Sequence, residues 1–203
     1  MTIKTDKIEL NARRNVSLVT MIQKVGGEFG DILKRPAILI LPGGGYAMCS
    51  DREAEAVAYP YLEAGFHAFV LRYSVGEHRI WPNPLEDYDQ AMEYILAHSG
   101  QWGLAGDKIV VIGFSAGGHL AGCAATLAKH RPGAAILAYA ALDQDIASAC
   151  QPGVEIPSPI DYVDSNTPPC FLFASRDDTS VPVKNTRQFM EKLEQFDIIL
   201  KPN

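Results

Sequence analysis

The sequence predicts an α/β fold, in which a mostly parallel central sheet carries helices on both faces. Short apolar segments that suit buried strands alternate with amphipathic segments that suit helices, as in parallel sheets covered on both sides. The 203 residues are 47% hydrophobic and 21% charged, which suits a protein with a substantial core. Two early segments with apolar residues at a period near two predict an antiparallel start to the sheet. We therefore expect a single domain over residues 1–203.

The expected strands fall into two kinds. The first two are half-buried and form a hairpin, whereas the later ones are almost continuously apolar. The run Ala37–Leu41 ends at Pro42 and three glycines, which indicates a buried strand entering a tight loop. In chain order, the expected strands are residues 3–10, 16–25, 37–41, 66–74, 107–114, 134–142 and 168–175, and residues 197–203 begin another.

The expected helices carry start and stop signals. The clearest is segment 83–100, where Pro84 suits the first turn, Glu86 suits the positive end of the helix dipole and Gly100 suits the end. Residues rich in Pro, Asp and Ser predict an irregular, cap-like excursion over 143–167. The expected helices are residues 51–65, 83–100, 115–130 and 181–196.

Charge and composition limit the kinds of binding partner and cofactor that we expect. The net charge is −6 and the sequence has no Lys/Arg-rich run, so it gives no reason to expect nucleic acid or a membrane as partner. The polar N-terminal segment lacks the apolar core of a signal peptide, and no stretch reaches the roughly 18 apolar residues of a spanning helix. We therefore expect a cytoplasmic protein whose four separated cysteines are reduced thiols. No metal-ligand spacing is present, and we expect no metal and no cofactor.

The segment Gly113-Phe114-Ser115-Ala116-Gly117 fits the pattern G-x-S-x-G between an apolar strand and a helix of small residues. A serine in such a sharp turn has a strained backbone and presents its hydroxyl above the sheet. The alternative is a glycine-rich turn that only packs tightly. The context favours Ser115 as a nucleophile.

Two further loops supply what such a nucleophile needs. Successive glycines after Pro42 let backbone N–H groups turn toward a ligand, so Gly44 or Gly45 would hold an oxyanion together with the N–H of Ala116. An ordinary glycine turn is the alternative.

The second loop, residues 175–182, follows a late strand. There Asp177 and Asp178 compete to orient an imidazole, and one of them would cap the helix that begins near Val181.

Together these stretches resemble the α/β-hydrolase superfamily, and more narrowly its small bacterial carboxylesterases of the acetyl-esterase or xylan-esterase type. Residues 41–46, LPGGGY, resemble the HGGGY-type oxyanion loop, with Pro42 in place of the usual histidine. Residues 113–122 are similar to the family's nucleophile elbow. Residues 175–186 resemble its D-x-x-V-P acid loop, and alignment on that pattern selects Asp178.

The resemblance implies a Ser-Asp-His triad whose histidine follows the last strand. No histidine occurs in that region of this sequence, so we expect a truncated chain that lacks the end of the last strand, the histidine loop and the final helix. An edge exposed in this way would favour a homo-oligomer. The alternative is a complete but catalytically silent binding protein.

None of the five histidines is favoured as the base. We expect His119, one helical turn after Ser115, to pack and hydrogen-bond beneath the elbow, because its position is poor for reaching the hydroxyl. Tyr46, in the glycine loop, and His78, in a loop that we expect to border the site, are candidates for contact with substrate. The others are expected at a buried strand start and at helix ends, namely His67, His98 and His130.

The function expected from residues and resemblance together is serine-dependent hydrolysis of short-chain carboxylic esters, a small-molecule substrate class. The excursion 143–167 is too small and polar for a large lipase lid, which favours short acyl groups. Acetylated sugars are a substrate class that the resemblance implies. A peptidase and a silent binder are the alternatives.

Overall fold

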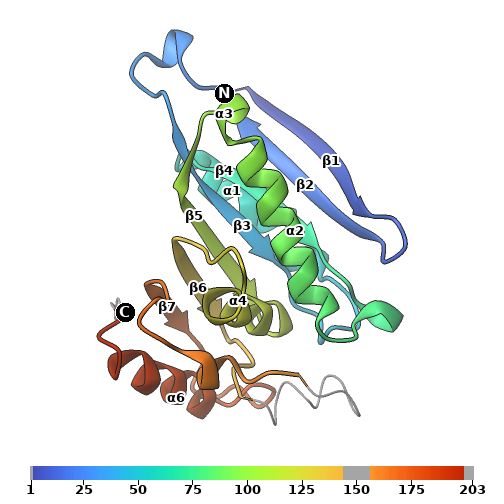
Figure 1. The fold of residues 1–203 in the computed structure, drawn as a ribbon, viewed down its shortest axis with the longest axis vertical. Coiled ribbons are helices and arrows are strands. Elements are labelled where there is room, and N and C mark those ends of the chain that lie inside the picture. Colours follow the sequence, from blue (N-terminus) through green and yellow to red (C-terminus); the bar gives the residue numbers. More distant parts are fainter. Residues whose placement is uncertain (1, 144–155, 199–203) are drawn as a thin grey trace.

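The computed structural model describes residues 2–143 and 156–198, and a seven-stranded sheet organises them (Figure 1). The strand order is β1-β2-β4-β3-β5-β6-β7. β2 runs antiparallel to both β1 and β4, and all other neighbours are parallel, which confirms the predicted fold class. The strands are β1 (Ile3–Asn11), β2 (Val16–Gln23), β3 (Arg35–Leu41), β4 (His67–Arg72), β5 (Leu104–Phe114), β6 (Ala134–Ala138) and β7 (Cys170–Phe173).

Helices cover both faces of this sheet. Side chains alternate along a strand, so Leu39 and Leu41 pack in the core beneath α2, α4 and α6, whereas Ile38 and Ile40 pack with α1 on the other face. The helices are α1 (Glu55–Glu63), α2 (Asn83–Ala97), α3 (Ser99–Trp102), α4 (Ala116–Thr126) and α6 (Val183–Glu194), and the short 3₁₀ turns are η1 (Gly27–Phe29), η2 (Asp51–Glu53), η3 (Gly76–His78) and η4 (Pro159–Tyr162). Within the described ranges, no helix combines the length and hydropathy needed to cross a membrane.

Several expected elements are shorter than the sequence indicated, and the structure shows where three of them end. The helix expected over 51–65 is divided, because Ala54 has a non-helical backbone (φ −107°, ψ −117°) between η2 and α1. β6 ends at Ala138, because Tyr139 adopts a left-handed φ of 36°. The helix after Ser115 ends at Thr126. Of the excursion over 143–167, residues 144–155 lie outside the described part, as do residues 199–203 of the expected last strand.

A buried ion pair joins the hairpin to the rest of the domain. The guanidinium of Arg14, in the turn between β1 and β2, donates to Asp87 on α2 and to the neighbouring Glu86. The Asp87 side chain is 0% exposed, and its second oxygen accepts the backbone N–H of Ser74 at 2.8 Å. The carboxylate therefore links the hairpin, α2 and the segment after β4.

Candidate active site

Ser115 occupies a strained turn between β5 and α4. Its backbone has φ 52° and ψ −115°, a conformation that L residues rarely adopt. A hydrogen bond to the neighbouring strand stabilises this conformation, because the Ser115 N–H donates to the carbonyl of Ala138 at 3.0 Å. A Cβ at Gly113 would lie 2.1 Å from the carbonyl oxygen of Gly117, and one at Gly117 would lie 2.2 Å from that of Leu41. The two glycines of the motif are therefore sterically required.

A cavity of about 380 Å³ collects most of the predicted site residues. It lies where β3, β5 and β6 end, which is the edge where open α/β sheets bind ligands. The nucleophile candidate, the glycine loop and the acid loop reach it from different elements. Its lining consists of Gly44, Gly45, Met48, Ser50, Arg52, Glu53, Ser115, Tyr139, Asp178, Ser180 and Val181.

The glycine loop folds back on itself at the mouth of this cavity. The carbonyl of Gly44 accepts the N–H groups of Ala47 and Met48, at 3.0 and 3.3 Å. Gly44 and Gly45 have φ of 130° and 61°, which explains the glycines. In the described part of the chain, no acceptor is bonded to the amides of these two glycines. The N–H of Ala116 is equally available, because the first residues of a helix have no intrahelical acceptor.

Asp178, one of the two aspartates that the sequence offered as the acid, is anchored by backbone donors, although α6 itself begins without a side-chain cap. Its Oδ1 accepts the N–H groups of Ser180 and Val181 at 2.8 and 2.9 Å, which fixes the side chain just before α6. The same residue lines the cavity with Ser115, whereas Asp177 is exposed and does not line it. The carboxylate of Asp178 is thus held in place by backbone donors.

His119 lies beneath the site and is fully buried. Its Nε2 donates to the carbonyl of Pro157 at 2.8 Å, and because a carbonyl only accepts, Nδ1 is left to accept the Tyr46 hydroxyl at 2.6 Å. This confirms the expectation that His119 packs and hydrogen-bonds below the elbow. Tyr46 is only 1% exposed. Its side chain therefore lies in the core and is not among the residues that line the Ser115 cavity, so its contact with substrate stays a prediction.

Burial lowers the pKa of His119 to about 4, so the stability of the fold should depend on this residue between pH 6.5 and pH 4. In the unfolded chain a histidine binds a proton below about pH 6.5, whereas folded His119 stays neutral, so stability falls as the pH falls. From pH 7 to pH 5 the loss is about 2 kcal/mol of unfolding free energy. Urea unfolding at both pH values should show a smaller loss in His119→Gln. An equal loss in the two proteins would contradict this assignment.

The other histidines are also engaged away from Ser115. His67 is buried at the start of β4 and accepts the N–H of Gln23 at 3.1 Å, as expected for a structural residue. His78 lies in η3 with its Nε2 3.6 Å from Glu77, and it is not among the residues that line the Ser115 cavity, so its contact with substrate stays a prediction. His98 and His130 bond to Tyr94 and Glu93.

Glu53 and Tyr139 line the cavity, although the sequence did not single them out. Glu53 was expected within the helix over 51–65, and Tyr139 within the strand over 134–142. The left-handed φ at Tyr139 ends β6 and turns the residue to the cavity, where its hydroxyl donates to Glu53 at 2.8 Å. A sequence signal for this pair is absent, because the two residues are 86 positions apart.

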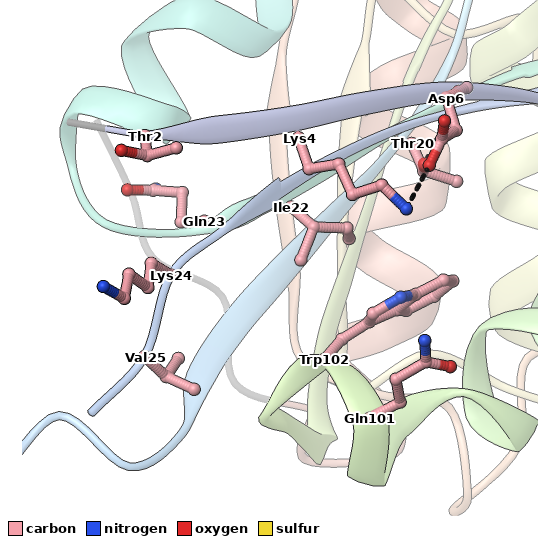
Figure 2. Close-up of a pocket in the computed structure, with 10 residues that line it drawn as sticks. All are labelled: Thr2, Lys4, Asp6, Thr20, Ile22, Gln23, Lys24, Val25, Gln101 and Trp102. Carbon is pink, nitrogen blue, oxygen red and sulfur yellow. Dashed lines mark hydrogen bonds and ion pairs between the residues drawn. The ribbon is translucent and has the colours of Figure 1, made fainter. Parts of the chain in front are cut away.

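A second cavity, also of about 380 Å³, lies at the opposite edge of the sheet between the β1–β2 hairpin and α3 (Figure 2). Trp102 and Gln101 form one side, and Lys4 is paired with Asp6 on the other at 2.9 Å. None of the predicted catalytic or oxyanion residues lines this cavity. We therefore place the candidate active site at Ser115.

The fold and the strained serine turn define an α/β hydrolase. Residues 31–152 match the family designated BD-FAE, and the chain belongs to this family. The crystal structure of MGS-M1, described as an α/β hydrolase enzyme from a Medee basin deep-sea metagenome library, is 42% identical with a TM-score of 0.90. The alignment covers 98% of this chain and 79% of that one.

Two curated proteins are more distant relatives. Endo-1,4-beta-xylanase B of Butyrivibrio fibrisolvens is 32% identical over 81% of this chain and 30% of its own length. The acetylxylan esterase of Xylanibacter ruminicola is 30% identical over 72% of this chain and 34% of its own length. The chain thus spans about a third of the length of these two relatives.

Proposed function

We propose that this chain carries the catalytic serine, the acid and the oxyanion loop of a carboxylic-ester hydrolase. The observation that carries the proposal is the cavity in which Ser115 meets Gly44, Gly45 and Asp178. The relation to an acetylxylan esterase and to an α/β hydrolase supports it.

The proposed reaction is acyl transfer through a covalent intermediate. Ser115 Oγ attacks the acyl carbon while a base removes its proton, and the C–O bond to the alcohol breaks as that proton is delivered to the leaving oxygen. Water then attacks the acyl-serine and releases the acid. Amides of Gly44 or Gly45 and of Ala116 stabilise the oxyanion in both steps.

The base in this proposal is an imidazole held by Asp178. Its Oδ1 is occupied by two backbone donors, which leaves Oδ2 to accept an imidazole N–H. None of the five histidines is among the residues that line the Ser115 cavity. We therefore assign the base to an imidazole from outside these 203 residues.

For the substrate we propose short-chain esters, with acetylated sugars as the first class to examine. The cavity has room for a small acyl group and is lined mainly by polar residues and glycines. The acetylxylan esterase among the relatives supports the sugar. The alternative is a binding protein that holds an ester in this cavity without reacting with it.

Acylation of Ser115 tests the proposal directly. The protein is incubated with p-nitrophenyl acetate and free imidazole, which replaces the absent base, and is then digested for mass spectrometry. We expect one acetyl group on the peptide that contains Ser115. A protein that binds the ester but stays unmodified at Ser115 would support the silent binder and contradict an esterase.

A further inference from the structure

We propose that Glu53 is a positioning residue for this reaction, because its carboxylate fixes the start of the oxyanion loop against Ser115 and Tyr139. The inference rests on the proposed function. It assigns a role to a residue that neither the triad nor the oxyanion amides require.

The carboxylate of Glu53 accepts two hydrogen bonds from different parts of the cavity wall. Its Oε2 accepts the N–H of Gly43 at 2.9 Å, at the end of β3, and its Oε1 accepts the Tyr139 hydroxyl at 2.8 Å, just after β6. The two strands are separated in the sheet by β5, which carries Ser115 at its end. Glu53 therefore links the ends of β3 and β6, the two strands that flank β5 and its Ser115.

Glu53 also lies close to the serine itself. A Cβ placed on Gly43 would lie 2.7 Å from Glu53 Oε2 and 3.2 Å from Ser115 Cβ, so the carboxylate and the serine crowd the same α-carbon. The segment before α1 holds this arrangement from the other side, since Ser50 N–H donates to the carbonyl of Gly43 at 2.8 Å. Both the N–H and the C=O of Gly43 are thus bound by residues 50–53.

This clamp decides which amides are available to the substrate. The N–H of Gly43 is occupied by Glu53, whereas the amides of Gly44 and Gly45 have no acceptor among the described residues. Without Glu53, the Gly43 amide is released and the loop keeps only the bonds to the Gly43 and Gly44 carbonyls, so the next two amides are held less firmly. A displacement of about 1 Å in such a group costs roughly a hundredfold in rate, and loss of one oxyanion donor costs about as much.

The side chain must accept two bonds, which explains a carboxylate at this position. Both partners of Glu53 are donors, and an ionised carboxylate offers an acceptor to each. A glutamine keeps the shape and can accept the Gly43 N–H, and the Tyr139 hydroxyl can turn to accept from its amide. Glutamine should therefore preserve the clamp in large part, whereas alanine removes it.

The test compares Glu53→Ala, Glu53→Gln and Glu55→Ala. Glu55 begins α1 close by, but it binds Arg72 and does not line the Ser115 cavity, so its variant is a matched control. We expect Glu53→Ala to lower the maximal rate of Ser115 acetylation by about tenfold to a hundredfold, with little change in the half-saturating ester concentration. Glu53→Gln should recover most of the rate, and Glu55→Ala should match the unmodified protein.

Amide hydrogen exchange provides a readout that does not depend on activity. Glu53→Ala should speed exchange of the Gly43 amide at least tenfold, whereas Glu55→Ala should leave it unchanged. If the unmodified protein does not acetylate Ser115, the proposed function fails, and fast exchange confined to Glu53→Ala still supports the clamp. Equal exchange in all proteins, or equal losses of rate in Glu53→Ala and Glu55→Ala, would overturn the proposal.

Discussion

Replacing Ser115 with alanine is expected to remove all imidazole-dependent hydrolysis of p-nitrophenyl acetate by this protein. A positioned general base contributes about a hundredfold or more to such a reaction. That gain requires a nucleophile whose proton the base removes, and here the nucleophile is the Ser115 hydroxyl. Members of a catalytic triad act as a unit, so a serine without its base contributes little. Added imidazole should therefore raise the rate of the unmodified protein about a hundredfold at saturation, and should have no such effect on Ser115→Ala.

The control for this experiment is Ser180→Ala. Ser180 lines the same cavity and is exposed, but it follows the acid loop and not the strained turn. Its replacement should leave the imidazole-dependent rate within about twofold. Hydrolysis by imidazole alone is subtracted with protein-free samples. Imidazole-dependent hydrolysis that survives in Ser115→Ala would show that another group is the nucleophile.

The largest effect on stability is expected from Asp87→Ala. This carboxylate is 0% exposed and joins Arg14 of the hairpin to the Ser74 amide. Removing one partner of a buried ion pair costs about 3–5 kcal/mol of unfolding free energy, and we expect the lower end of that range here because Arg14 keeps its bonds to Glu86 and Asn83. The variant also leaves a buried backbone N–H without an acceptor. Urea unfolding at neutral pH measures the loss.

Glu86 offers a matched comparison, because it binds the same guanidinium from the adjacent position. Its side chain is 58% exposed, so its ion pair is screened by water. Glu86→Ala should therefore cost less than about 1 kcal/mol. Losses of similar size in the two variants would mean that burial does not decide the strength of these ion pairs.

The sequence by itself determined the architecture and the candidate nucleophile. Apolar strands alternating with amphipathic helices specify a parallel sheet, because only that arrangement buries both faces of each strand. The glycines around Ser115 indicated that two backbone segments approach closely. The structure confirms this, because a Cβ added at Gly113 would lie only 2.1 Å from the carbonyl oxygen of Gly117. These features are local along the chain, and for this reason the pattern was sufficient to predict them.

Only the tertiary structure decided which side chains share the cavity. Alignment on the acid-loop pattern already selects Asp178 over Asp177, and the structure adds the two backbone donors that hold its carboxylate at the cavity. Tyr46 follows the glycine loop, but its hydroxyl is hydrogen-bonded to His119 in the core. The pairing of Glu53 with Tyr139 joins residues 86 positions apart. Such contacts depend on where the strands end relative to one another in the sheet. The periodicity of the sequence carries no information about those relative positions.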